Sequence, residues 1–288
     1  MLANLYRPIH RPAPRFRAGL TEISNDEIRG KAPSVFADAA HAQTSDRYAF
    51  LPTIEVVDRM RDDGWAVVMA AQQKVRNESR EGFQKHILRF RRRDQLGQST
   101  EFFTDVVLVN SHDRSCAYQL HAGIFRMVCG NGMIVADSTF AKVSIKHLHF
   151  DPGDVIDASA NVVTSVPALE DRIGRFRSTA LSDHERTAFA EAALLTRYES
   201  LEQAPVRAEK VLEPRRYADG TPTLWNTFNV VQENLIRGGL RDPRKRKPDG
   251  KRFPKTRAIQ AIDADVKLNK ALWHLAEALQ AEKSPVDV

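Results

Sequence analysis

Residues 102–135 constrain the fold of this chain more than any other stretch, because they alternate as strands do. Residues 102–109 are rich in aromatic and β-branched side chains, and apolar residues then recur at every second position, at Tyr118, Leu120, Ala122 and Ile124. This period is typical of strands with one buried face. The sequence therefore predicts two neighbouring strands at the centre of the fold.

A tight turn is expected after these strands. Gly130-Asn131-Gly132 tolerates positive φ and favours a hairpin between residues 127–128 and 133–135. The apolar positions change parity shortly before this turn, and Gly123 lies at the change. Glycine leaves the most room for an irregular strand, so we expect a β-bulge at Gly123.

Strands and helices alternate irregularly over the rest of the chain. Residues 65–75, 84–93 and 141–149 have strand character. Apolar spacing predicts several helices, including a leucine-rich one at the C-terminus. Helices are expected to begin at Thr53, at the Ser182/Glu185 capping box and at Thr221-Pro222, and to end at Gly64 and Gly238-Gly239. Pro167 is expected to kink or divide one helix. We expect an α+β fold, with a central mostly antiparallel sheet, helices packed on it and a C-terminal helical region.

Composition along the chain predicts three parts. Residues 1–30 carry prolines and basic residues without lasting periodicity, and are expected to form a basic N-terminal arm. Residues 31–204 are expected to form the α+β core domain. A polar connection around residues 205–220 then leads into the C-terminal helical region, residues 205–288, which contains a basic loop at residues 240–258.

The central stretch also resembles a known family. An Asn-Ser-His-Asp step followed by an Arg-x-x-Cys-x-Asn-Gly step resembles phage and plasmid proteins catalogued as domain-of-unknown-function family 932. The signature positions are Asn110, His112, Asp113, Arg126, Cys129, Asn131 and Gly132. The resemblance extends back to Ser45 and forward to Leu224 and the residues after it, and it implies a protein of a mobile genetic element without defining a reaction.

Positive charge is concentrated in one segment. Residues 241–257 hold nine lysines and arginines against two aspartates, a local charge of +7 in a chain whose formal net charge is +6. Such patches indicate an anionic partner. The predicted nucleic-acid-binding residues in this segment are Arg241, Arg244, Lys245, Arg246, Lys247, Lys251, Arg252, Lys255 and Arg257. The prolines and glycine among them predict a mobile loop.

A second set of cations lies on a predicted strand. Arg89, Arg91 and Arg93 share one face of residues 84–93, because side chains alternate along a strand. Guanidinium groups bind phosphate oxygens in a bidentate fork, so this face is a candidate for tracking a phosphate backbone. The alternative is a solvated outer face whose charges pair with acidic residues of the next strand.

Candidate catalytic and metal-binding residues are weaker signals. His112, Cys116, His121 and Cys129 are possible zinc ligands, but their spacing fits no compact zinc motif, so we predict no metal. His112, Asp113, His147 and His149 are the candidates for a metal-dependent nuclease centre. Neighbouring residues cannot orient one another as a triad, so Ser111-His112-Asp113 does not predict a hydrolase, and Asp113 is interpreted as a turn residue.

These observations favour a nucleic-acid-binding protein of a mobile genetic element. We expect DNA rather than RNA, and single-stranded DNA in replication, recombination or transfer, with Phe253 or Tyr6 stacking on bases. The alternatives are a metal-dependent nuclease and a module that binds a host protein. The sequence has no phosphate-binding glycine loop, and we expect no cofactor. We expect a cytoplasmic protein with reduced thiols, no membrane contact and possible homo-oligomerisation.

Overall fold

The fold is built on one antiparallel sheet. The computed structural model describes residues 21–44, 50–75, 77–98, 102–126, 132–134, 143–145 and 166–283. Over these residues the sheet has six strands in the order β1-β2-β3-β4-β5, with β6 also paired to β4. The strands are β1 (Trp65–Gln72), β2 (His86–Arg92), β3 (Phe102–Asn110), β4 (Tyr118–Arg126), β5 (Gly132–Ile134) and β6 (Val143–Ile145). The α+β prediction is confirmed.

The predicted pairing of two successive strands is confirmed, although residues 123–125 and not 127–128 are the ones seen to pair, and the predicted bulge is wrong. Strand β4 pairs antiparallel with β5, and residues 127–131 between them lie outside the described residues. The register between β3 and β4 runs unbroken past Gly123, which pairs with Asp105. The irregularity is in β1 instead, between Val67 and Met69.

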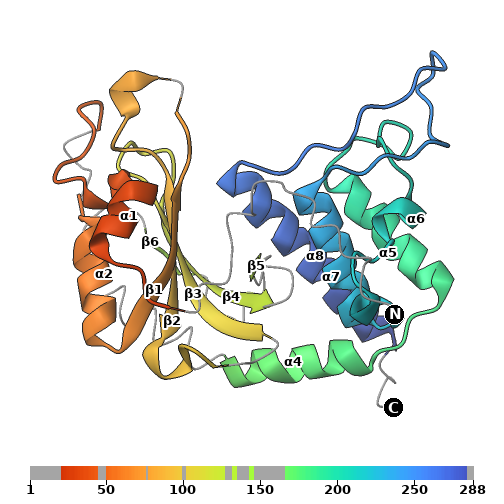
Figure 1. The fold of residues 1–288 in the computed structure, drawn as a ribbon, viewed down its shortest axis with the longest axis horizontal. Coiled ribbons are helices and arrows are strands. Elements are labelled where there is room, and N and C mark those ends of the chain that lie inside the picture. The colour runs from red at the N-terminus through yellow and green to blue at the C-terminus, as the bar shows by residue number, and fades with distance from the viewer. Residues whose placement is uncertain are drawn as a thin grey trace, which may run out of the picture.

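The N-terminal helices cover one face of the sheet (Figure 1). They are α1 (Asn25–Lys31), the 3-10 turn η1 (Pro33–Phe36) and α2 (Thr53–Asp62). Ser24 and Glu27 form a capping box at α1, and the Ile23 N–H donates to the Val67 carbonyl at 2.8 Å. The expected N-terminal arm is therefore wrong for residues 21–30, which belong to the fold, while residues 1–20 are outside the described residues.

Thr53 is not the cap of α2. The N-cap residue is Pro52, and the buried Thr53 hydroxyl contacts histidines of the sheet instead. Gly64 follows the helix with φ of 82°, as predicted. The ends of α2 were thus found from sequence, but the partner of its first side chain was not.

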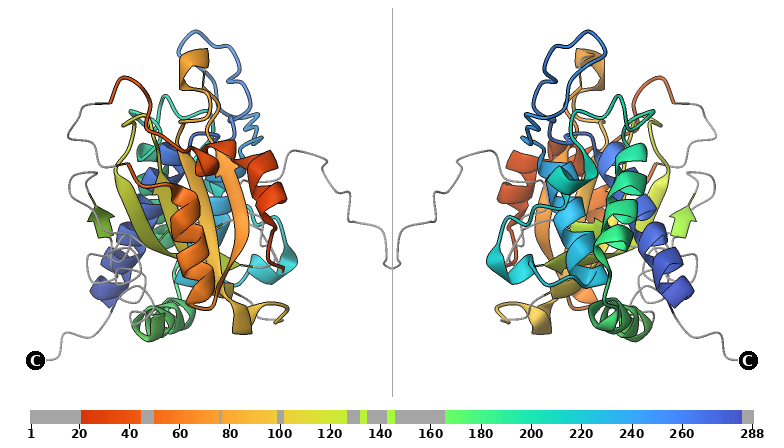
Figure 2. Two further views of the ribbon diagram at one scale, coloured as in Figure 1. Left: turned by 90° about the vertical axis from the view of Figure 1, so that its left-hand side faces the viewer. Right: turned by 90° about the vertical axis from the view of Figure 1, so that its right-hand side faces the viewer.

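Residues 166–283 are mainly helical and lie beside the opposite face of the sheet (Figures 1 and 2). Helix α8 begins at Ile262, which packs with Ile87 of β2, and Lys85 pairs with Asp263 at 2.7 Å. The helices are α4 (Val166–Ser178), α5 (Asp183–Leu195), α6 (Ala208–Val211), α7 (Leu224–Arg237) and α8 (Ile262–Lys283). None of the described helices is long and apolar enough to cross a membrane.

Several helix signals are confirmed. Ser182 and Glu185 form the predicted capping box, and α7 ends at Gly238 with φ of 59°. Pro167 stands at the second position of α4, where proline is compatible with a helix beginning. Helices α4 and α5 pack with α7 and α8, so the part of residues 31–204 after the sheet lies with the C-terminal helices.

Helix α7 is buried on all sides, which the sequence did not indicate. Glu233 lies on the face opposite the leucines, where solvation was expected, but it is 2% exposed. It accepts hydrogen bonds from both terminal nitrogens of Arg216, at 2.7 and 2.6 Å, and also pairs with Arg237. A buried carboxylate requires such partners, because desolvation without them is costly.

Candidate nucleic-acid interface

Two of the predicted phosphate-binding arginines are buried inside the fold. Arg89 and Arg91 are 0% exposed, and both pair with Asp105 of β3 at 2.8 Å. The Arg91 guanidinium also lies 3.4 Å from the centre of the Phe103 ring. The prediction that this face tracks a phosphate backbone is therefore wrong for both residues. Pairing with an acidic neighbour, the alternative, is confirmed, but the face is not solvated.

The burial of these arginines has an electrostatic consequence. Burial lowers the pKa of Arg89 to about 10, while the Asp105 charge opposes this change and the Arg91 charge adds to it. The Arg89 guanidinium therefore remains charged at neutral pH. The role of both arginines is to hold β2 against β3, because one carboxylate joins two arginines of the neighbouring strand.

Arg93 is exposed but lies away from the other predicted cations. It follows β2 in the 3-10 turn η3 (Arg93–Gln95) and pairs with Glu22 at 3.5 Å. In Figures 1 and 2 this end of the sheet is opposite the end at which residues 241–257 project. The structure therefore does not gather Arg93 and the basic segment onto one surface.

The basic segment, residues 241–257, is a hairpin that projects from the helical half of the molecule (Figures 1 and 2). Arg246 forms an antiparallel bridge with Arg252, and the Lys247 N–H donates to the Lys251 carbonyl at 2.9 Å. A β-turn closes the tip, where the Gly250 N–H donates to the Lys247 carbonyl and Gly250 has φ of 78°. We call this segment the basic hairpin.

The basic hairpin presents most of its cations to solvent. Lys245 is half-buried, and the exposed ones are Arg241, Arg244, Arg246, Lys247, Lys251, Arg252, Lys255 and Arg257. Lys251 pairs with Asp249 at 3.2 Å, and the other aspartate of the segment, Asp242, is buried at its base. The predicted basic residues of this segment are therefore brought together on one projecting element.

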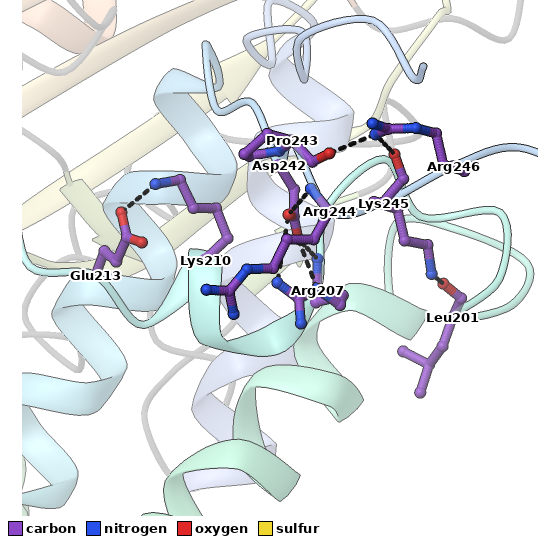
Figure 3. A network of polar contacts seen from close by, with 9 residues as sticks. All are labelled: Leu201, Arg207, Lys210, Glu213, Asp242, Pro243, Arg244, Lys245 and Arg246. Carbon is purple, nitrogen blue, oxygen red and sulfur yellow. Dashed lines mark hydrogen bonds and ion pairs between the residues drawn. The ribbon is translucent and has the colours of Figure 1, made fainter. Parts of the chain in front are cut away.

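The base of the basic hairpin is fixed to the helices (Figure 3). Arg207 donates to Asp242 from its side chain at 2.9 Å and from its backbone N–H at 3.2 Å. The Arg244 N–H donates to the same carboxylate at 3.0 Å, and the Lys245 ammonium donates to the Leu201 carbonyl at 2.8 Å. The first strand of the hairpin is thus held by both ionic and hydrogen-bonding contacts.

Asp242 titrates well below an ordinary aspartate. Burial, the largest influence, raises its pKa, but hydrogen bonds from the Arg207 side chain and from the backbone N–H groups of Arg244 and Arg207 lower it to about 2. The carboxylate therefore stays ionised at neutral pH. The clamp between Asp242 and Arg207 orients the hairpin throughout the physiological range.

The described signature residues have structural roles. Asn110 donates to the Thr53 hydroxyl at 3.0 Å, and this hydroxyl also contacts His86 and His112 at 2.9 and 3.2 Å. Ser34 joins the other side of the His86 ring at 3.0 Å. This buried network ties η1 and α2 to the sheet. Among the other signature residues, Gly132 begins β5, Arg126 ends β4, and Cys129 and Asn131 lie outside the described residues.

Of the four catalytic candidates, the structure describes His112 and Asp113. Burial lowers the pKa of His86 to about 4, opposed by a hydrogen bond that the ring donates to the Gln84 carbonyl and by the Asp113 charge. Asp113 accepts the Ser115 N–H at 3.0 Å, as a turn residue does. The described residues contain no group of three His, Cys, Asp or Glu suited to a metal ion. His147 and His149 lie outside them.

Cys116 and His121 complete the candidate ligands that the structure describes. Burial raises the pKa of Cys116 to about 11, although a hydrogen bond with Ser111 opposes this rise. A thiol with such a pKa is protonated at neutral pH and is a poor nucleophile. His121 lies in β4, opposite Val107, and its Nε2 contacts Gln119 at 3.1 Å.

Two features of the site were missed from sequence. Pro248-Asp249-Gly250 is a turn signal, and it could have predicted a hairpin instead of a mobile loop. Arg207 and its partner Asp242 are 35 residues apart, so no local pattern connects them. The turn is therefore predictable from neighbouring residues, whereas the contact between Arg207 and Asp242 depends on the tertiary structure.

Comparison with known proteins identifies the class of this chain. The family described as a domain of unknown function, DUF932, matches residues 40–273, and the chain belongs to this family. Two relatives from Escherichia coli (strain K12), UPF0380 protein YafZ and UPF0380 protein YfjQ, are each 37% identical over 257 residues, which cover 89% of this chain and 91% of each relative. No solved structure matches. The predicted family is confirmed, while a phage or plasmid origin stays a prediction.

Proposed function

We propose that this protein binds nucleic acid through the basic hairpin. The observation that carries the proposal is the cross-strand pairing of Arg246 with Arg252 at the end of a projecting ribbon. Like charges directly opposite each other destabilise a strand pair. The Arg246 side chain also donates to the Pro243 and Lys245 carbonyls of the hairpin, and both arginines are exposed. The pair therefore concentrates positive charge at an exposed position, where an anionic partner would neutralise it.

Phosphate is the anion that fits this arrangement best. Guanidinium groups bind phosphate oxygens with two parallel hydrogen bonds, and lysines add point charges. Exposed cations on both strands of the hairpin match a polymer that repeats its phosphates, and counterion release then adds to the affinity. We propose DNA as the polymer and a role in the replication, recombination or transfer of a mobile element.

The rigid attachment of the basic hairpin to the helices supports this proposal. The Asp242 clamp and the Lys245 contact with Leu201 hold the hairpin before a partner arrives. Binding then orders fewer residues and costs less conformational entropy. An acidic protein surface is the competing partner, and capture from lysate that persists after nuclease treatment would support it instead.

The test is binding of labelled single- and double-stranded DNA oligonucleotides to the purified full chain over a range of salt concentrations. We expect binding at low salt, and R246A/R252A should reduce the salt slope by roughly 0.7 per lost phosphate contact on single strands and 0.9 on duplex. K31A/R59A removes two exposed cations from the N-terminal helices and should change neither quantity. Absence of binding to both DNA forms would refute the proposal, and an unchanged slope in R246A/R252A would refute the assignment of the arginine pair as the phosphate site.

A further inference from the structure

Phe253 is the one aromatic residue in the basic hairpin, and its position is unusual for a large apolar side chain. It is half-buried, yet it is not among the residues packed on either hydrophobic cluster in the described part of the chain. Its ring contact is with Lys247, whose ammonium lies 6.0 Å from the ring centre. The ring therefore lies near a lysine and outside both hydrophobic clusters.

Stability does not account for this ring. The Lys247 ammonium lies 6.0 Å from the ring centre, at the outer limit of cation–π contacts, so this contact stabilises the hairpin little. Phe228 and Phe176, in contrast, pack against Trp273 inside the helical half. A partly accessible ring with a lysine near it and an exposed arginine next to it in the chain has the two components of a base-stacking platform, namely a π face and positive charge close by.

We propose that Phe253 stacks on an unpaired base, so that the substrate is single-stranded DNA. This inference rests on the proposed function, and it adds the form of DNA that is bound. In a duplex the faces of the bases are covered by their neighbours, whereas a single strand exposes them. The surrounding cations hold the backbone, and Phe253 selects strands whose bases are free.

The arrangement of the hairpin is consistent with a base at Phe253 and phosphates beside it. The Lys247 ammonium lies over the ring at 6.0 Å from its centre and Arg252 precedes Phe253 in the chain, so the phosphates next to a base stacked on the open face would have positive charge within reach. On the first strand, the Lys245 contact with Leu201 limits movement of the hairpin relative to the helices. The stacking face is therefore presented in a defined position.

The first test replaces the ring while keeping an apolar side chain. F253L should lower the affinity for a mixed-sequence single-stranded oligonucleotide by about 5- to 150-fold, the effect of losing one stacked base. Affinity for the duplex of that oligonucleotide and the slope against salt should stay at the values of the unsubstituted protein, because no phosphate contact is removed. F253Y keeps the π face and should retain binding. Equal losses on both DNA forms, or no loss on single strands, would overturn the inference.

The second test observes stacking directly. The three native tryptophans, Trp65, Trp225 and Trp273, are buried, so the tryptophan of F253W would be the one half-exposed indole. Single-stranded DNA should quench the fluorescence of F253W strongly, and duplex should not. Unchanged melting temperatures for F253L and F253W would confirm that position 253 is outside the core. Saturating single-stranded DNA without quenching would overturn stacking at this position.

The two proposals fail in different ways. If R246A/R252A weakens binding but F253L and F253W show no effect, nucleic-acid binding stands and stacking falls. If the unsubstituted protein binds no DNA, both fall together. If F253L reduces binding to single strands while R246A/R252A leaves the salt slope unchanged, the arginine pair is not the phosphate site, although the stacking site remains.

Discussion

Arginines alternate in both β2 and the basic hairpin, but the two regions use them in opposite ways. In β2, Arg89 and Arg91 are 0% exposed and share the carboxylate of Asp105. In the hairpin, Arg246 and Arg252 are exposed and stand opposite each other. The same side chain joins strands in one region and is available to a partner in the other.

The difference comes from what covers each strand. Strand β2 lies between β1 and β3 and has apolar residues packed on both faces, so a charge there must be paired when it is desolvated. The hairpin projects from the helices and its charges keep their water. Alternation shows which side chains share a face, but it does not show whether that face is covered.

Removal of the shared carboxylate should have the largest effect. D105N leaves Arg89 and Arg91 buried without a counter-charge, and we expect the free energy of unfolding to fall by about 3–5 kcal/mol. Urea denaturation measures this. D249N removes an exposed carboxylate from the hairpin and should change stability by less than about 0.5 kcal/mol. A loss below about 1 kcal/mol in D105N would show that the buried arginines do not depend on Asp105.

The buried side of β2 should also respond to pH. Burial lowers the pKa of His86 from 6.5 to about 4, so as pH falls the unfolded chain takes up the proton first. The contribution of neutral His86 to the free energy of unfolding is fully present above pH 6.5. It is lost as pH falls towards about 4, a change of about 3 kcal/mol. H86Q should flatten the stability profile in this window, while H184Q, at an exposed position on α5, should not. An unchanged profile in H86Q would contradict the assignment.

The attachment of the hairpin should depend on Gly238. A Cβ at this residue would lie 2.5 Å from the Arg257 backbone, and φ of 59° disfavours other residues. G238A should lower the free energy of unfolding by about 1–3 kcal/mol and weaken DNA binding, because the base of the hairpin must shift. In α1, a Cβ added at Gly30 would have no neighbouring atom within 4 Å, so G30A should stabilise the protein by about 0.4–1 kcal/mol. Calorimetry should therefore show a lower melting temperature for G238A and a higher one for G30A.

The smallest effect on stability should come from reversing one hairpin charge. R252E places opposite charges across the strand pair, and we expect a gain of about 0.2–1 kcal/mol in stability. DNA affinity should fall at the same time, because a phosphate-binding group becomes a repelling one. Opposite signs for stability and binding would confirm that this charge serves a partner. A loss of both would show that Arg252 also supports the hairpin.

Much of the fold followed from local signals. The hydrophobic period located β1 to β4, and the caps at Ser182 and Gly238 marked helix ends, because both depend on residues near each other in the chain. Burial of Glu233 was missed, because it depends on Arg216 and on the helices around α7. The bulge assigned to Gly123 was wrong for a similar reason, since the side-chain parity of one strand does not define its pairing.

The candidate site was predictable only in part. The concentration of positive charge in residues 241–257 is visible in the sequence, and the structure keeps most of it exposed. Inclusion of Arg89 and Arg91 was wrong, because Asp105 and the second layer of the fold come from other parts of the chain. Sequence identified where cations are numerous, but it could not show which of them are solvated.

The sequence by itself determined the family, the strands and helices with local signals, and the position of the basic segment. These properties depend on residue type and short spacing. The tertiary structure decided which arginines bind Asp105, which stand opposite each other in a hairpin, and how Asp242 fixes that hairpin to Arg207. The physical reason is that the cost of a charge depends on its solvent and counter-charges, and both are set by segments distant in sequence.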